Sequence, residues 1–127
     1  MNIRKFLLVF LTVISSSARA EWILYGEGHD VTAYYSPPAN SKNLDNVKVW
    51  VLYNFNKVQQ GQTVIYWSKK ELTEVDCPSQ SSRWISASWY SEQMGMGDLV
   101  YSFPSGDWGQ IPSGSLTHNL YKIVCNQ

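Results

Sequence analysis

Six short β-prone runs follow one another along this chain and restrict it to a few possible folds. From Trp22 onward, runs rich in Val, Ile, Tyr, Trp and Phe alternate with turn residues. The runs are WILYGEG, DVTAYYS, VKVWVLYNF, VIYWSKKELTEVDC, RWISASWYS and DLVYSFP. No amphipathic stretch of helical length separates them, so hairpins or short loops must connect about six strands. The sequence therefore predicts a single antiparallel sheet.

The run VKVWVLYNF predicts a strand with two unequal faces, because side chains alternate along a strand. One face carries only apolar and aromatic residues: Val47, Val49, Val51, Tyr53 and Phe55. The other face has an apolar centre between polar ends: Lys48, Trp50, Leu52 and Asn54. We expect the first face to be buried and part of the second to be covered as well, by a helix, a folded sheet edge or a second copy of the protein.

The C-terminal segment SLTHNLYKIVC predicts one helix that could provide such a cover. Leu116, Leu120 and either Ile123 or Val124 fall on one helical stripe. Ser115 is placed to cap the N-terminus. A helix of about ten residues is marginal alone in water, so it must dock on the sheet. The fold class is then α+β, mainly β.

The first twenty residues are predicted to be a secretory signal peptide. MNIRK supplies two positive charges, FLLVFLTVI gives nine mostly apolar residues, and SSSARA ends in the small-x-small pattern of a cleavage site. The apolar run is about half of the twenty or so residues that a membrane-spanning helix needs. Cleavage after Ala20 would leave one domain, residues 21–127, in the periplasm or outside the cell. No cysteine stands near the new N-terminus, so we expect no lipid anchor.

Two cysteines, Cys77 and Cys125, are expected to form a disulfide, because export brings the chain into an oxidising compartment. The bond would tie the C-terminal helix to the strand that ends at Cys77. A zinc site built from the cysteines with His29 and His118 is the alternative. It lacks any C-x-x-C or H-x-x-x-H spacing, so no metal and no other cofactor is expected.

The stretch YSEQMGMGDLVYS contains a G-x-G fragment at Gly95 and Gly97. A phosphate-binding loop needs a further glycine and a following helix, whereas here a β-prone run follows. A turn between two strands requires only that Gly95 or Gly97 adopt a positive φ. We therefore interpret both glycines as structural turn residues.

Few residues are available for catalysis, and no enzymatic activity is expected. His29 lies between two predicted strands and His118 on the polar side of the predicted helix, and no G-x-S-x-G motif occurs.

The charge pattern indicates a binding surface instead. Without Arg4, Lys5 and Arg19, the chain has seven basic and ten acidic residues, so nucleic acid is not an expected partner. Its central segment alone is positive. The binding candidates are four basic residues of that segment and two neighbouring tryptophans: Lys57, Trp67, Lys69, Lys70, Arg83 and Trp84. Such a surface suits a protein or an envelope polymer. Of the other four tryptophans, Trp22, Trp50 and Trp108 are expected to lie mostly in the core.

Five short motifs occur in order between residues 47 and 125. They are Trp50 within VKVWVLYNF, then SKKELTEVDC, then YSEQMGMG, then W-x-x-I-P-x-G-S from Trp108, and finally YKIVC. In these motifs the chain resembles the surface-adhesin protein E family of Gram-negative bacteria.

This resemblance implies an antiparallel sheet with a C-terminal helix tethered by a Cys77–Cys125 disulfide. It places Met94, Gly95 and Gly97 on a turn between strands. It also implies binding to host extracellular proteins and a tendency to form homodimers. Two functions stay open: an exported adhesin-like binder of host matrix or envelope proteins, and a periplasmic accessory or inhibitor protein with no adhesive role.

Overall fold

The computed structural model of the protein describes residues 21–38 and 45–126. The predicted signal peptide, residues 1–20, lies outside these described residues, and its cleavage stays a prediction.

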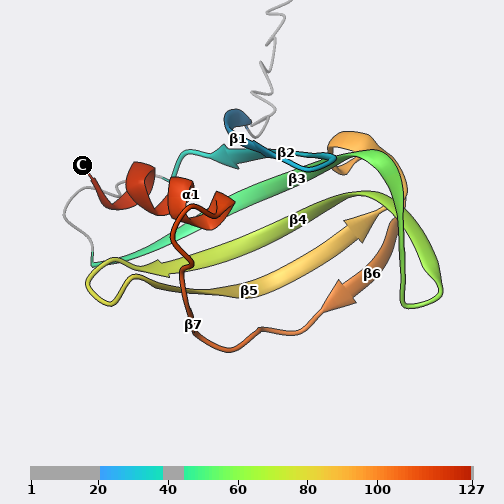
Figure 1. The fold of residues 1–127 in the computed structure, drawn as a ribbon. Helices are drawn as coiled ribbons and strands as arrows, with labels where there is room; N and C mark the ends of the chain where they lie inside the picture. The colour runs from blue at the N-terminus through green and yellow to red at the C-terminus, as the bar shows by residue number, and fades with distance from the viewer. Residues whose placement is uncertain (1–20, 39–44, 127) are drawn as a thin grey trace, which may run out of the picture.

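Seven strands form one antiparallel sheet (Figure 1). They are β1 (Ile23–Gly28), β2 (Val31–Ser36), β3 (Asn46–Gly61), β4 (Val64–Asp76), β5 (Ser81–Tyr90), β6 (Leu99–Phe103) and β7 (Gly109–Gln110). The order across the sheet is β1-β2-β3-β4-β5-β6, and β7 pairs with β5 beyond the end of β6. Each connection joins neighbouring strands from β1 to β6, so the predicted antiparallel sheet is confirmed. The two-residue strand β7 was not predicted.

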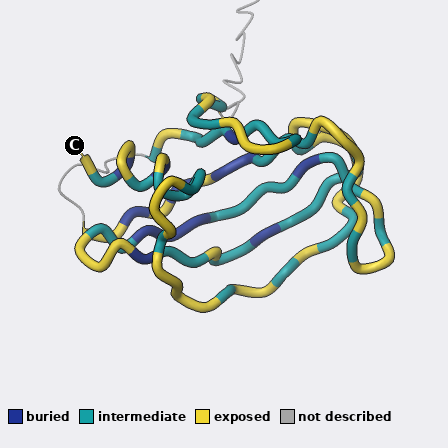
Figure 2. Tube along the Cα trace, in the orientation of Figure 1, coloured by how far each residue is buried: buried dark blue, intermediate teal, exposed yellow. Residues whose placement is uncertain are grey.

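The helix α1 (Leu116–Cys125) lies across one face of the sheet, which we call the helix face. Its stripe packs on the valine face of β3 and on β4. The sequence indicated this helix as a cover for the opposite face of β3, so the helix forms as predicted but covers the other face. The buried core consists of Val47, Val49, Val51, Val75, Leu120 and Val124. Figure 2 shows buried stretches of the strands beside and beneath the helix. Val124 rather than Ile123 completes the stripe, because Ile123 is exposed.

Ser115 caps the helix as predicted, since its hydroxyl accepts a hydrogen bond from the His118 amide at 3.1 Å. This bond satisfies one of the amide groups that have no partner within the helix. The C-terminal end is held by the Cys77–Cys125 disulfide, whose Cα atoms are 5.7 Å apart. The helix is therefore fixed at both ends, by a cap and by a covalent bond to the end of β4.

A second apolar cluster lies on the helix face beyond the helix and consists of aromatic rings. Trp89 stacks on Tyr66 with ring centroids 4.0 Å apart and meets Phe103 edge-on at 4.7 Å. Tyr101 and Phe55 extend the cluster on either side. These rings fill the part of the helix face that α1 is too short to cover, which accounts for much of the aromatic content.

The opposite face of the sheet, which we call the open face, carries no α-helix or second sheet layer within the described residues. The turn between β5 and β6 covers the part of this face around Asn54 and Ser68. Leu52 is fully buried there. The expectation that part of this face is covered is therefore confirmed.

Trp50 points to the open face and is 45% exposed, so its predicted core position is wrong. Trp108 is also exposed, at 43%, so its predicted core position is wrong too, and the Arg83 guanidinium lies over its ring. Trp22 is half-buried at the start of the described domain.

Candidate functional site

The open face contains a cavity of about 300 Å³ near the middle of the sheet. Its lining, which defines the open-face cavity, consists of Trp22, Ser36, Trp50, Lys70, Ser88 and Tyr90. Strand register brings most of these residues together: Ser36 pairs with Trp50 across β2 and β3, and Lys70 pairs with Ser88 across β4 and β5. Four central strands therefore contribute one or two side chains each to a single site.

Lys70 is the only charged residue that lines the open-face cavity. Its ammonium lies 5.0 Å from the centroid of the Tyr90 ring, within the range of a cation–π contact. Within residues 21–38 and 45–126, Lys70 forms no ion pair with a carboxylate. The cavity thus combines aromatic surfaces with one positive charge that no described carboxylate neutralises.

The turn between β5 and β6 contacts the Lys70 side chain. The turn contains a short 3-10 helix, η1 (Gln93–Gly95), and Gly95 and Gly97 have φ values of 70° and 77°. Gly95 lies so close to Lys70 that a Cβ atom there would overlap the lysine Cε. The absence of a side chain at Gly95 therefore makes room for Lys70 as well as allowing the positive φ.

Buried polar groups attach this turn to the sheet. The Ser68 hydroxyl donates a hydrogen bond to the Glu92 carbonyl at 2.6 Å and accepts one from the Gly95 amide at 2.8 Å. The Asn54 side-chain oxygen accepts a hydrogen bond from the Met94 amide at 2.7 Å. Because Ser68 is fully buried, these bonds fix the turn, and with it the side of the cavity where Lys70 lies.

The structure does not gather the sequence-predicted binding residues into one surface. Lys69 and Lys70 are neighbours in β4 and so point to opposite faces. Lys69 lies 3.4 Å from Glu71, and Arg83 lies 2.6 Å from Glu74, so both charges are largely compensated. Of the four basic candidates, Lys70 alone lines the open-face cavity.

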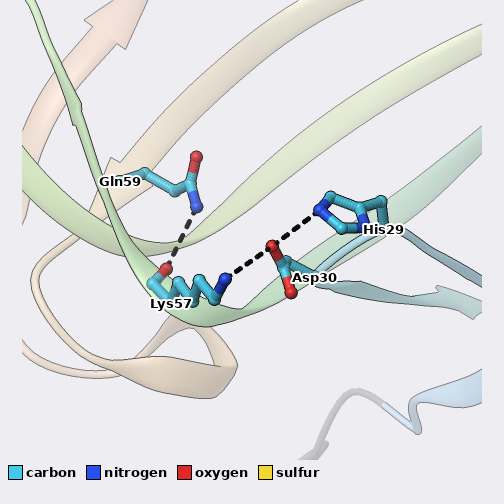
Figure 3. Close-up of polar contacts among 4 residues, drawn as sticks. All are labelled: His29, Asp30, Lys57 and Gln59. Atoms are coloured by element: carbon cyan, nitrogen blue, oxygen red, sulfur yellow. Dashed lines mark hydrogen bonds and ion pairs between the residues drawn. The ribbon is translucent and has the colours of Figure 1, made fainter.

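Lys57 lies in β3 beside the turn between β1 and β2, where Figure 3 shows its contacts. Its ammonium is 3.5 Å from Asp30, which also lies 3.2 Å from His29. The Lys57 carbonyl accepts a hydrogen bond from the Gln59 side chain at 3.1 Å. Asp30 has a φ of 58°, so these contacts surround a tight turn, and His29 is a turn residue as the sequence predicted.

Trp84 and Lys69 line a separate groove of about 160 Å³ on the helix face. This helix-side groove is lined by Lys69, Glu71, Trp84, Ala87, Trp89 and Phe103. Trp84 is 40% exposed, and its indole N–H donates a hydrogen bond to the Pro104 carbonyl at 2.9 Å. The groove already contains both members of an ion pair, so it offers less net charge to a ligand than the open-face cavity does.

Tyr53 lies under the Lys69 ammonium, 4.7 Å from ring centroid to nitrogen. Burial, with the nearby negative charge of Glu71, raises the pKa of Tyr53 to about 12. Burial also raises the pKa of Tyr25. Both phenols therefore stay neutral at physiological pH and pack against the buried core of the helix face.

Trp67, the remaining candidate, lies beside the turn between β5 and β6. With Ser91, Glu92 and Gln93 it lines a third hollow, of about 330 Å³. A carboxylate faces this hollow and none of the basic candidates does, so Trp67 does not share a surface with them.

Sequence reasoning missed most of the open-face cavity, namely Trp22, Ser36, Trp50, Ser88 and Tyr90. The signal for Trp50 was present, because alternation along β3 places it opposite the buried valines. In the described part of the chain, no group of three or more His, Cys, Asp and Glu residues could hold a metal ion. No helix there is long and apolar enough to cross a membrane.

Comparison with known proteins gives one match. The family model described as surface-adhesin protein E matches residues 22–126, which is nearly all of the described chain. No curated protein and no solved structure is significantly similar to the chain.

Proposed function

The chain belongs to the surface-adhesin protein E family, and we propose that it is an exported, non-enzymatic binding protein that attaches to host extracellular-matrix or envelope proteins through its open face. The signal-peptide pattern of residues 1–20 supports export to the periplasm or the cell exterior. The family match supports a surface role.

The observation that carries this proposal is the exposure of large apolar side chains on the part of the open face that the turn between β5 and β6 leaves uncovered. Trp50 lies near the centre of this face, and Leu24 and Leu99 lie toward its edges with about half of their surface exposed. Exposed apolar surface of this kind marks interaction sites, and tryptophan is a frequent energetic centre of protein interfaces. The open edges of the sheet leave room for the homodimer that the family resemblance implies.

Location is tested by protease treatment of intact cells, followed by detection of the protein that survives. We expect digestion, because an adhesin must be accessible from outside. A periplasmic protein of the same cells serves as the control for an intact envelope. Complete protection of this chain alongside that control would favour the periplasmic accessory or inhibitor role and would contradict the adhesin role.

The surface is tested with Trp50→Ala in the exported protein, measured for binding to an immobilised basement-membrane extract. We expect the affinity to fall by about 30-fold, because truncating a central interface tryptophan costs about 2 kcal/mol or more. The matched control is Trp84→Ala, which removes a tryptophan of similar exposure from the opposite face. Equal binding by the Trp50 variant and the wild type would contradict the assignment of the open face.

A further inference from the structure

From the lining of the open-face cavity we infer that it binds an acidic saccharide, a sugar unit bearing a carboxylate, of the host extracellular matrix. This inference rests on the proposed function, because it assigns a ligand class to the same face. The cavity presents three aromatic rings, two serine hydroxyls and one ammonium group. These are the groups that a uronate sugar ring requires: an apolar plane, hydroxyl partners and a positive charge.

The aromatic rings provide the plane. Trp50 is the most exposed of the three, and Trp22 and Tyr90 complete the lining. The face of an aromatic ring is electron-rich, so it attracts the weakly positive C–H groups on one side of a sugar ring. An apolar protein side chain would make only the ring contact here and would leave Lys70 and the two serines without partners.

The hydroxyl groups are available to a ligand. Ser36 has no side-chain hydrogen bond to another described residue, and Ser88 has only a long contact of 3.5 Å to the Ser102 hydroxyl. Because a serine hydroxyl both donates and accepts, each can pair with a sugar hydroxyl in either orientation. Ser36 comes from β2 and Ser88 from β5, so they contact the sugar from different strands on either side of β3 and β4.

Charge selects an acidic sugar over a neutral one. Lys70 is the single charge in the lining, and the described residues provide no carboxylate within ion-pair distance of it. The Tyr90 ring and the Gly95 backbone border the lysine, which limits the positions that its ammonium can take. A ligand carboxylate would form a charge-assisted hydrogen bond with this ammonium, and such bonds are stronger than those between neutral groups.

The test is titration of the exported protein with a hyaluronan hexasaccharide, followed by calorimetry and by tryptophan fluorescence. The matched ligand is the same hexasaccharide with its carboxyl groups reduced to alcohols. We expect the wild type to bind the acidic form about tenfold more tightly than the reduced form. We also expect this preference to weaken at high salt, because the charged contact lies at the surface.

Two variants separate a charge contact from a structural role of Lys70. Lys70→Gln is expected to lose the tenfold preference and to bind both sugars as the wild type binds the reduced one. Lys122→Gln, which removes an exposed cation from α1, is expected to keep the preference. Equal weakening of both sugars by Lys70→Gln, with the preference intact, would overturn the inference, because Lys70 would then only support the fold.

Failure of this inference is distinguishable from failure of the proposed function. If the wild type binds neither sugar but Trp50→Ala still weakens binding to the basement-membrane extract, the acidic-saccharide inference is overturned and the open face remains the binding surface for a protein. If binding to both the sugars and the extract is unaffected by Trp50→Ala, both proposals are overturned.

Discussion

Replacing both cysteines with serine is expected to lower the free energy of unfolding by about 4 kcal/mol. The disulfide joins residues that are 48 positions apart, and in the chain-entropy model a loop of this length restricts the unfolded chain by about that amount. The bond also holds a ten-residue helix that is too short to be stable alone. Urea unfolding of the Cys77→Ser, Cys125→Ser variant against the oxidised wild type measures the difference.

Removing the disulfide should also weaken one part of the structure more than the rest. Hydrogen exchange is expected to show the largest loss of protection in α1, because its C-terminal end is released, and a smaller loss in β3 and β4. The Cys77→Ala, Cys125→Ala variant controls for the polarity of serine at half-buried positions. A urea midpoint equal to that of the wild type in both variants would contradict the conclusion that the bond fixes the helix to the sheet.

Gly95→Ala is expected to lower both the stability of the fold and the affinity of the open face. Gly95 has a φ of 70°, and an L-residue with a side chain costs about 1–2 kcal/mol in that conformation. The new Cβ would also overlap the Lys70 side chain, so the lysine must leave its position beside the cavity. Thermal unfolding measures the first effect, and binding to the hyaluronan hexasaccharide and its reduced form measures the second.

Two other glycines separate the causes. Gly114 has a φ of 80°, but a methyl group there would have no neighbouring atom within 4 Å, so Gly114→Ala measures the backbone cost alone. Gly109 has neither a positive φ nor a neighbouring atom within 4 Å of an added Cβ, so Gly109→Ala is expected to leave the stability nearly unchanged. If Gly95→Ala reduced stability by the same amount as Gly114→Ala and left the preference for the acidic sugar unchanged, the contact between this turn and Lys70 would have no functional meaning.

The parts of the fold that sequence predicted are those set by local rules. Alternation along β3 placed Val47, Val49 and Val51 on one buried face, and the stripe and cap of the last segment predicted α1 within a residue. The disulfide was predicted from the expected export and from the presence of only two cysteines in the sequence. Each of these features depends on neighbours that are close in sequence, or on a pairing with no competitor.

The features that the sequence did not predict depend on the register between strands and on which parts of the sheet are covered by another element. Leu72 pairs with Ser86 but Thr73 pairs with Trp84, so Ile85 is an extra residue in β5. Strict alternation from Ala87 would place Trp84 on the open face, whereas this bulge moves it to the helix face. Bulges of this kind leave little trace in composition, which is why the basic and aromatic candidates could not be assigned to one surface.

The exposure of Trp50 was missed for a different reason. Alternation assigns a side chain to a face but does not say whether another element covers that face. The only α-helix of the described chain is ten residues long and packs on the valine face, so Trp50 on the open face stays exposed. A large apolar residue such as Trp50 is therefore assigned to the core from the sequence. In the structure it is exposed on the open face and becomes a candidate for binding.

Hydroxyl-radical footprinting of the protein bound to the basement-membrane extract tests the use of the open face most directly. Trp50 and Trp84 have similar exposures, 45% and 40%, on opposite faces of one sheet, so each acts as the reference for the other. We predict that binding protects Trp50 from oxidation and leaves Trp84 as reactive as in the free protein. Protection of Trp84 with unchanged oxidation of Trp50 would contradict the assignment of binding to the open face.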